Sequence, residues 1–274
     1  MVCRLIAGFP ARRVYIALLL ATALALGGCS GRGPRVTVTI AGSTSVQPFA
    51  EILAEEFMTG RPDIAINVQG GGSSAGYRAV ASGAAQIGML SRVLSPGEGD
   101  VIPVTIATDA ISVIVHASNP VEALPSKHLE AVFTGLTRNW STLGGPDRPI
   151  HVISREDGSG TRGSFDDAVL GKSLVMPYAV VQDSNGSVLE TVASDPYAIG
   201  YVSLGLVDPR VKTVAIDGVV PNPDTAGSGQ YRIVRPFLFV TSGEPEGAVK
   251  EFISFVISEQ GQRILRDNGL IAGT

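Results

Sequence analysis

The stretch Ser154–Arg162 reads SREDGSGTR, and it stands between a strand-like run, Ile150–Ile153, and a helix-like run, Ser164–Leu170. It combines an arginine, carboxylates, glycines and hydroxyls at the start of the expected helix. Free backbone N–H groups, hydroxyl donors and a guanidinium that can bind two oxygens at once are the components of an anion site. The same residues also suit an ordinary turn and a capped helix, because Gly and Ser are common in turns. This stretch alone leaves both interpretations open.

The same succession of strand, Gly/Ser-rich turn and helix occurs four times, at Ser43, Ser73, Ser159 and Ser184. This alternation predicts an α/β protein with a largely parallel sheet. Helix capping explains single serines. It explains less well the run Gly70–Gly76, which reads GGGSSAG and gathers glycines and hydroxyls in one turn.

Two apolar runs indicate how the chain divides. Val101–Val115 is almost continuously apolar, and Tyr231–Val240 is apolar again near the end. We interpret the first run as leaving one lobe for another and the second as returning. The expected lobes are residues 35–110 with 231–274 and residues 111–230. A helix with Phe49, Ile52, Leu53 and Phe57 on one face and a loop over Asn222–Gly229 are also predicted.

The N-terminus predicts export. Arginines precede an apolar run of about 13 residues, which is short for a membrane span and typical of a signal peptide. Small residues before Cys29 resemble a bacterial lipobox, so we expect a lipoprotein signal peptide at 1–28, lipid (palmitate) on Cys29 and a tether at 29–34. A plain secretory signal or a single-span anchor is the alternative. The protein would then be anchored at the cell membrane, facing the periplasm or the cell exterior.

Composition excludes several classes of function. The net charge of −4 argues against nucleic-acid binding. Removal of the signal peptide and lipidation of Cys29 would leave no thiol for a disulfide or a thiolate metal site. The three histidines lack metal-ligand spacing, and SREDGSGTR lacks the P-loop lysine. We therefore expect no cofactor, no metal and no enzymatic activity.

With these motifs in hand, the chain resembles the phosphate-binding proteins of bacterial ABC importers over essentially its whole length after the N-terminal segment. The motifs that carry the resemblance are Gly42–Pro48, Gly70–Gly76, Ile87–Arg92, Phe133–Gly135 with Asn139 and Trp140, Ser154–Arg162, and Ala198–Val202. The resemblance implies a two-lobed periplasmic-binding-protein fold of the class II type, with two αβ lobes joined by crossing hinge strands. It also implies a monomer that holds inorganic phosphate between the lobes and delivers it to the permease subunits.

The resemblance also implies which residues bind phosphate. The matching positions are Thr44, Ser45, Ser73, Ser91, Arg155, Ser159, Gly160 and Thr161. Asp157 would pair with Arg155 and hold its guanidinium, and Ser74 would support the site.

One position departs from the family pattern. Some members have an aspartate that accepts the proton of hydrogen phosphate where this chain has Ser91. Sulfate carries no such proton, so an unpaired acceptor would reject it. Here we expect the discrimination to come from Ser91, a backbone carbonyl or Asp157.

Three other functions stay open from the sequence. One is a binding protein or sensor for another oxyanion such as sulfate. The others are a secreted serine hydrolase or phosphatase and a structural surface lipoprotein that binds no anion.

Overall fold

The computed structural model describes residues 36–273 of the chain, and Val36–Thr274 forms one compact unit. The predicted signal peptide (1–28), the tether (29–34) and the lipidation site at Cys29 lie outside the described residues. We use the names lobe 1 and lobe 2 for the two groups of elements defined below.

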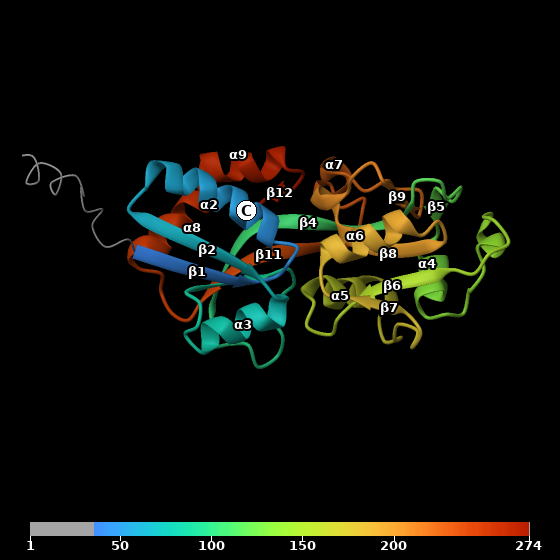
Figure 1. Cartoon of the computed structure of the whole chain (residues 1–274), viewed down its shortest axis with the longest axis horizontal. Coiled ribbons are helices and arrows are strands. Elements are labelled where there is room, and N and C mark those ends of the chain that lie inside the picture. Colours follow the sequence, from blue (N-terminus) through green and yellow to red (C-terminus); the bar gives the residue numbers. More distant parts are fainter. Residues whose placement is uncertain (1–35, 274) are drawn as a thin grey trace, which may run out of the picture. The chain divides into compact units, whose positions relative to one another are not determined.

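Lobe 1 is built on the strand order β2-β1-β3-β11-β4. Strands β2, β1 and β3 are parallel, and β11 runs antiparallel to both β3 and β4. Figure 1 shows α2, α8 and α9 along one side of these strands and α3 along the other. The elements are β1 (Val36–Gly42), α2 (Gln47–Gly60), β2 (Ile64–Gly70), α3 (Ser73–Ala81), β3 (Ile87–Leu90), β4 (Ile102–His116), β11 (Val234–Thr241), α8 (Gly247–Ile257), α9 (Glu259–Asp267) and β12 (Ile271–Ala272).

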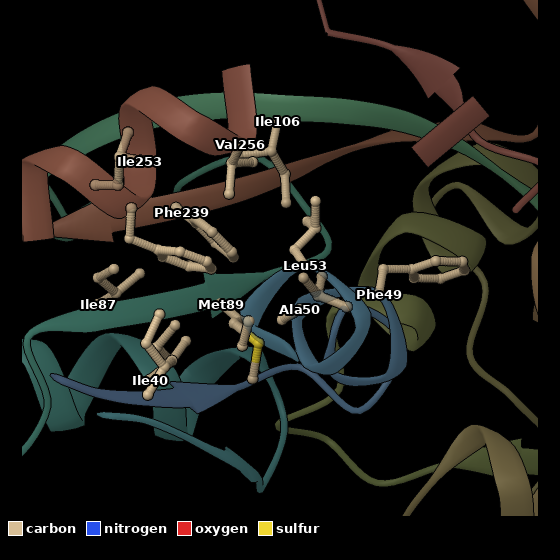
Figure 2. Close-up of a cluster of buried hydrophobic side chains, with 14 of the residues drawn as sticks. Ile40, Phe49, Ala50, Leu53, Ile87, Met89, Ile106, Phe239, Ile253 and Val256 are labelled. Carbon is tan, nitrogen blue, oxygen red and sulfur yellow. The ribbon is translucent and has the colours of Figure 1, made fainter. Parts of the chain in front are cut away.

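The core of lobe 1 forms because side chains alternate across its strands. Met89 and Phe239 point toward α2 and α8, while their neighbours Leu90 and Leu238 pack in a second cluster with Val80 of α3. Figure 2 shows the first cluster, which includes Ile40, Leu53, Ile106, Ile253 and Val256. Because both faces of the sheet are packed, the strands are fixed in place, and so are the polar turns that follow their ends.

Strand β4 connects the two lobes. It pairs with β11 as far as Ala110 and with β8 from Ile111 onward, so it changes partners between two adjacent residues. β4 therefore belongs to both groups of elements. The returning segment includes Tyr231 and Ile233, which pack in the lobe 2 core before β11 begins.

Lobe 2 continues the sheet in the order β4-β8-β6-β7. Val152 and Tyr201 face one core cluster, and their neighbours Ile153 and Val202 face the cluster beneath α6. The elements are β5 (Ala123–Leu124), α4 (Ser126–Phe133), the 3₁₀ helix η1 (Trp140–Leu143), β6 (His151–Arg155), α5 (Gly160–Phe165), the π-helix η2 (Asp166–Leu170), β7 (Val180–Gln182), α6 (Asn185–Ser194), β8 (Ala198–Ser203), the 3₁₀ helix η3 (Leu204–Leu206), β9 (Val211–Thr213), β10 (Ala215–Ile216) and α7 (Pro223–Gly227).

Two local predictions are wrong. The expected loop over Asn222–Gly229 contains α7, because the Asn222 side chain accepts from the Thr225 N–H and the Thr225 hydroxyl accepts from the Asn222 N–H, which forms a capping box. Ile52 was expected on the buried face of α2, but it is 40% exposed. The buried stripe follows Phe49, Leu53 and Phe57, which are spaced four residues apart.

Within residues 36–273, no helix is both long and apolar enough to cross a membrane.

Candidate functional site

The end of β6 positions Arg155, whose side chain is 1% exposed. Nε and Nη2 donate to the two carboxylate oxygens of Glu156 at 2.9 and 3.0 Å. They also donate to the carbonyls of Gln182 at 3.2 Å and Asp183 at 3.1 Å. From lobe 1, the Thr44 hydroxyl accepts from Nη2 at 3.2 Å. The guanidinium is therefore fixed from several sides, which sets the direction of its remaining nitrogen.

That remaining nitrogen, Nη1 of Arg155, is buried and has no hydrogen-bond partner among the described residues. A buried donor on a charged group is costly to leave unpaired. An anion placed against Nη1 would satisfy this donor and would place negative charge beside the guanidinium.

Hydroxyl groups from both lobes lie beside the arginine. Ser45 Oγ in lobe 1 is 2.8 Å from Thr161 Oγ1 in lobe 2, and it accepts from the Asn185 side-chain amide at 2.7 Å. All three side chains are buried. Thr161 lies in the first turn of α5, and Asn185 is the first residue of α6, so two of the Gly/Ser-rich turns converge on Ser45.

A cluster of serines closes the other side. Ser43 Oγ donates to Ser91 Oγ at 2.8 Å, and the Ser91 N–H donates to Ser73 Oγ at 3.0 Å. Gly160 of α5 packs against this cluster, because a Cβ at position 160 would overlap Ser73 Oγ and lie 2.7 Å from Ser91 Oγ. We use the name candidate anion site for Thr44, Ser45, Ser73, Ser91, Arg155, Gly160 and Thr161.

Three predicted residues have other contacts. Ser159 Oγ caps α5 by accepting from the Arg162 N–H at 3.2 Å. The Ser74 N–H donates to the Gly158 carbonyl at 3.2 Å, so its backbone joins the two lobes. The prediction that Asp157 holds Arg155 is wrong. The Asp157 side chain is 93% exposed and its carboxylate pairs with Arg162 at 2.6 Å.

Glu156 takes the position expected of Asp157. It directly follows Arg155, so its side chain can turn back and receive two N–H groups of the guanidinium, whereas Asp157 lies one residue further into the turn. Sequence reasoning also missed Ser43 and Asn185. Their signals were present, because both belong to Gly/Ser-rich turns that the strand–turn–helix pattern identifies.

The cations around the candidate anion site are paired with carboxylates. Arg162 contacts Asp166 at 3.4 Å in addition to Asp157, and Arg92 pairs with Glu98 at 2.7 Å. Burial raises the pKa of the Asp166 carboxyl, with Arg162 opposing the shift. The site therefore offers directed hydrogen-bond donors rather than a large excess of positive charge.

The Arg92–Glu98 pair provides a pH-dependent contribution to stability. Hydrogen bonds from Arg92 are the main cause that lowers the pKa of Glu98 below its ordinary value of 4.5. The folded state thus favours the charged form, and this stabilisation is present above pH 4.5 and lost as the pH falls through the folded pKa. We expect Glu98→Gln to lower the free energy of unfolding at pH 7, with the difference from the parent shrinking as the pH falls below 4.5. Urea denaturation across pH 3–7 measures this, and a difference that is constant with pH would contradict it.

Comparison with known proteins agrees with this architecture. A family model described as a PBP superfamily domain matches residues 30–260. The phosphate-binding protein PstS of Bacillus subtilis is 34% identical over 244 residues, which are 87% of this chain and 81% of that protein.

Solved structures give the same result. The phosphate-bound substrate-binding protein assigned to a phosphate ABC transporter of Clostridium perfringens has a TM-score of 0.85 and 40% identity, covering 87% of this chain and 100% of that one. The ABC-type phosphate transport receptor of Vibrio cholerae has a TM-score of 0.72 and 34% identity, covering 86% and 100% of the two chains. The predicted periplasmic-binding-protein fold is confirmed. The chain belongs to the PBP superfamily and, within it, to the PstS family of phosphate-binding proteins.

Proposed function

We propose that this protein binds inorganic phosphate between its two lobes and delivers it to the permease subunits of an ABC importer, without catalysing a reaction. The observation that carries the proposal is the buried Nη1 of Arg155, which lacks a partner among the described residues. Hydroxyls of both lobes lie beside it, at Thr44 and Ser45 on one side and Thr161 on the other. The names of the related proteins, which include a phosphate-bound structure, support phosphate as the anion.

The proposed binding residues are those of the candidate anion site together with the backbone of Ser159. The oxygens of bound phosphate would accept hydrogen bonds from Arg155 Nη1, from hydroxyls of lobe 1 and from backbone N–H groups at the start of α5. Such donors replace the hydration shell of the anion, and their fixed positions reduce the entropic cost of binding. Closure of the lobes over the anion would be the change that a permease recognises.

The remaining parts of the proposal concern location. We propose an exported monomer that faces the periplasm or the cell exterior, with lipid on Cys29 as its membrane anchor. The sequence of the N-terminal segment supports this anchor. Mass spectrometry of the membrane fraction tests it, since a diacylglyceryl modification on Cys29 is expected and an unmodified cysteine in that fraction would exclude it.

Sulfate binding is the second candidate, and a specific observation favours it. Both oxygens of Glu156 are bonded to Arg155, and Asp157 faces Arg162. Neither carboxylate is therefore free to accept the proton of hydrogen phosphate. In our proposal Ser91 Oγ accepts a hydrogen bond from the P–OH group of hydrogen phosphate, and Asp157 has no part in selectivity.

Titration calorimetry with phosphate and with sulfate tests the proposed function. We expect one phosphate to bind per chain, and sulfate to bind at least about tenfold more weakly, because one missing hydrogen bond to a charged group corresponds to roughly 1.5–3 kcal/mol. A Ser91→Ala variant should reduce that difference. Equal affinity of the parent for the two anions would exclude phosphate as the preferred ligand.

A further inference from the structure

A buried ion pair joins the two strands that connect the lobes. Arg235 of β11 lies directly opposite Asp109 of β4, and its Nε and Nη2 donate to Asp109 Oδ2 at 3.0 and 2.9 Å. Both side chains are 0% exposed. Burial raises the pKa of Asp109 and lowers the pKa of Arg235, so removal from water opposes both charges. Buried ion pairs add little net stability compared with apolar packing, but they can fix a particular geometry.

The pair lies at the point where β4 passes from one lobe to the other. Asp109 is within the segment paired with β11, and Ile111, two residues later, is already paired with Ser203 of β8. Any rotation of the lobes about β4 must be accommodated close to this position.

Hydrogen bonds lead from the pair into lobe 1. Arg235 Nη1 donates to the Ser91 carbonyl at 3.5 Å, which is the longest bond of the set. The Ser91 N–H in turn donates to Ser73 Oγ at 3.0 Å. Arg235 therefore contacts the backbone of a residue whose hydroxyl belongs to the candidate anion site.

Hydrogen bonds also lead from the pair into lobe 2 and back to the site. Ser203 Oγ donates to Asp109 Oδ1 at 2.8 Å, and the Ser203 N–H donates to Asn185 Oδ1 at 3.1 Å. The Asn185 amide then donates to Ser45 Oγ at 2.7 Å. The two paths end at Ser73 and Ser45, which both belong to the candidate anion site.

We infer that Asp109, Arg235 and Ser203 are positioning residues for anion binding. Asp109 and Arg235 on the connecting strands, together with Ser203 of β8, hold Ser91 at one end and the Asn185–Ser45 contact at the other. None of the three is among the residues proposed to contact the anion. The inference rests on the proposed function for its effect on affinity, but its effect on geometry can be measured without any anion.

Two variants interrupt the paths at different points. Ser203→Ala removes the hydroxyl bond to Asp109, and Arg235→Lys keeps the charge beside Asp109 but shortens the reach to Ser91. The matched control is Tyr231→Phe, which removes a buried hydrogen bond of 2.8 Å to the Ile111 carbonyl on the same strand but lies outside both paths.

The first measurement compares the ¹H–¹⁵N spectrum of each variant with that of the parent in the absence of anion. For each variant, the informative resonances belong to the lobe that does not carry the substitution. Ser203→Ala should shift the backbone amide resonance of Ser91, and Arg235→Lys should shift the side-chain amide resonances of Asn185. Tyr231→Phe should shift neither, although it lowers the melting temperature. A purely structural ion pair would produce no such effect across the lobes, so unchanged resonances in both variants would overturn the inference.

The second measurement is the dissociation constant for inorganic phosphate. Both path variants should bind about 2- to 13-fold more weakly than the parent, the range for one neutral hydrogen bond, while Tyr231→Phe should stay within about twofold. If the parent binds phosphate and both path variants bind it equally well, the inference is overturned. If the parent binds no phosphate, the proposed function is wrong. The spectra without anion then still test whether Asp109, Arg235 and Ser203 hold the geometry of the site.

Discussion

An Arg155→Ala variant should bind phosphate about 10- to 150-fold more weakly than the parent, which corresponds to roughly 1.5–3 kcal/mol for one lost hydrogen bond between charged groups. The substitution removes the buried Nη1 donor and also the bond from Nη2 to Thr44 in lobe 1. It therefore removes both a contact to the anion and a contact between the lobes. Titration calorimetry with inorganic phosphate measures the change.

Arg210→Ala is the matched control for Arg155→Ala. Arg210 also belongs to lobe 2 and also forms ion pairs, with Asp208 and Glu190, but its side chain is half exposed and its partners lie outside the candidate anion site. We expect this control to bind phosphate as the parent does. Retention of the parental affinity by Arg155→Ala would contradict the central role of that arginine.

A Gly160→Ala variant should weaken phosphate binding about 5- to 150-fold, because overpacking typically costs about 1–3 kcal/mol. The new Cβ would overlap Ser73 Oγ and come within 2.7 Å of Ser91 Oγ, and both serines belong to lobe 1. The conflict arises only where the lobes meet, so the helix α5 itself can form. The expected signature is a loss of affinity with little change in melting temperature.

Gly163→Ala, in the same helix, separates this effect from a general effect of alanine in α5. The nearest atom to a Cβ at position 163 is Arg92 Cδ at 3.8 Å, which is an ordinary contact distance. This control should bind phosphate within about twofold of the parent, since Gly163 is only partly buried and a substitution that adds no close contact usually has a small effect. Equal losses of affinity in the two variants would refute the explanation by lobe closure.

The sequence predicts the fold well where a local pattern has one physical solution. The β-branched run that begins at Val36 and the apolar run Ile64–Val68 each end in a Gly/Ser turn before a helix, and parallel pairing brings those ends together. The apolar run Val101–Val115 predicts one strand that enters a sheet and another that leaves for a different region, whereas the structure has the single continuous strand β4 there. β4 changes partners between Ala110 and Ile111, where the expected boundary between the lobes also falls, although the pairing itself depends on distant strands rather than on local sequence.

The candidate site was harder to predict because it depends on side-chain direction. Asp157 and Glu156 are both suitable partners for Arg155 in the sequence, and only the path of the turn decides that Glu156 faces the guanidinium. Asn185 reaches Ser45 across 140 positions of the chain, a contact that no local pattern encodes. The Asp109–Arg235 pair likewise requires the cross-strand register of β4 and β11.

The most direct test of this account is a crystal structure of the protein with phosphate. We predict one phosphate between the lobes, with an oxygen within hydrogen-bond distance of Arg155 Nη1 and further contacts to Ser45, Ser73 and Thr161. Phosphate bound elsewhere on the chain would contradict the account. So would a structure obtained at saturating phosphate in which the lobes are closed over Arg155 and no phosphate lies between them.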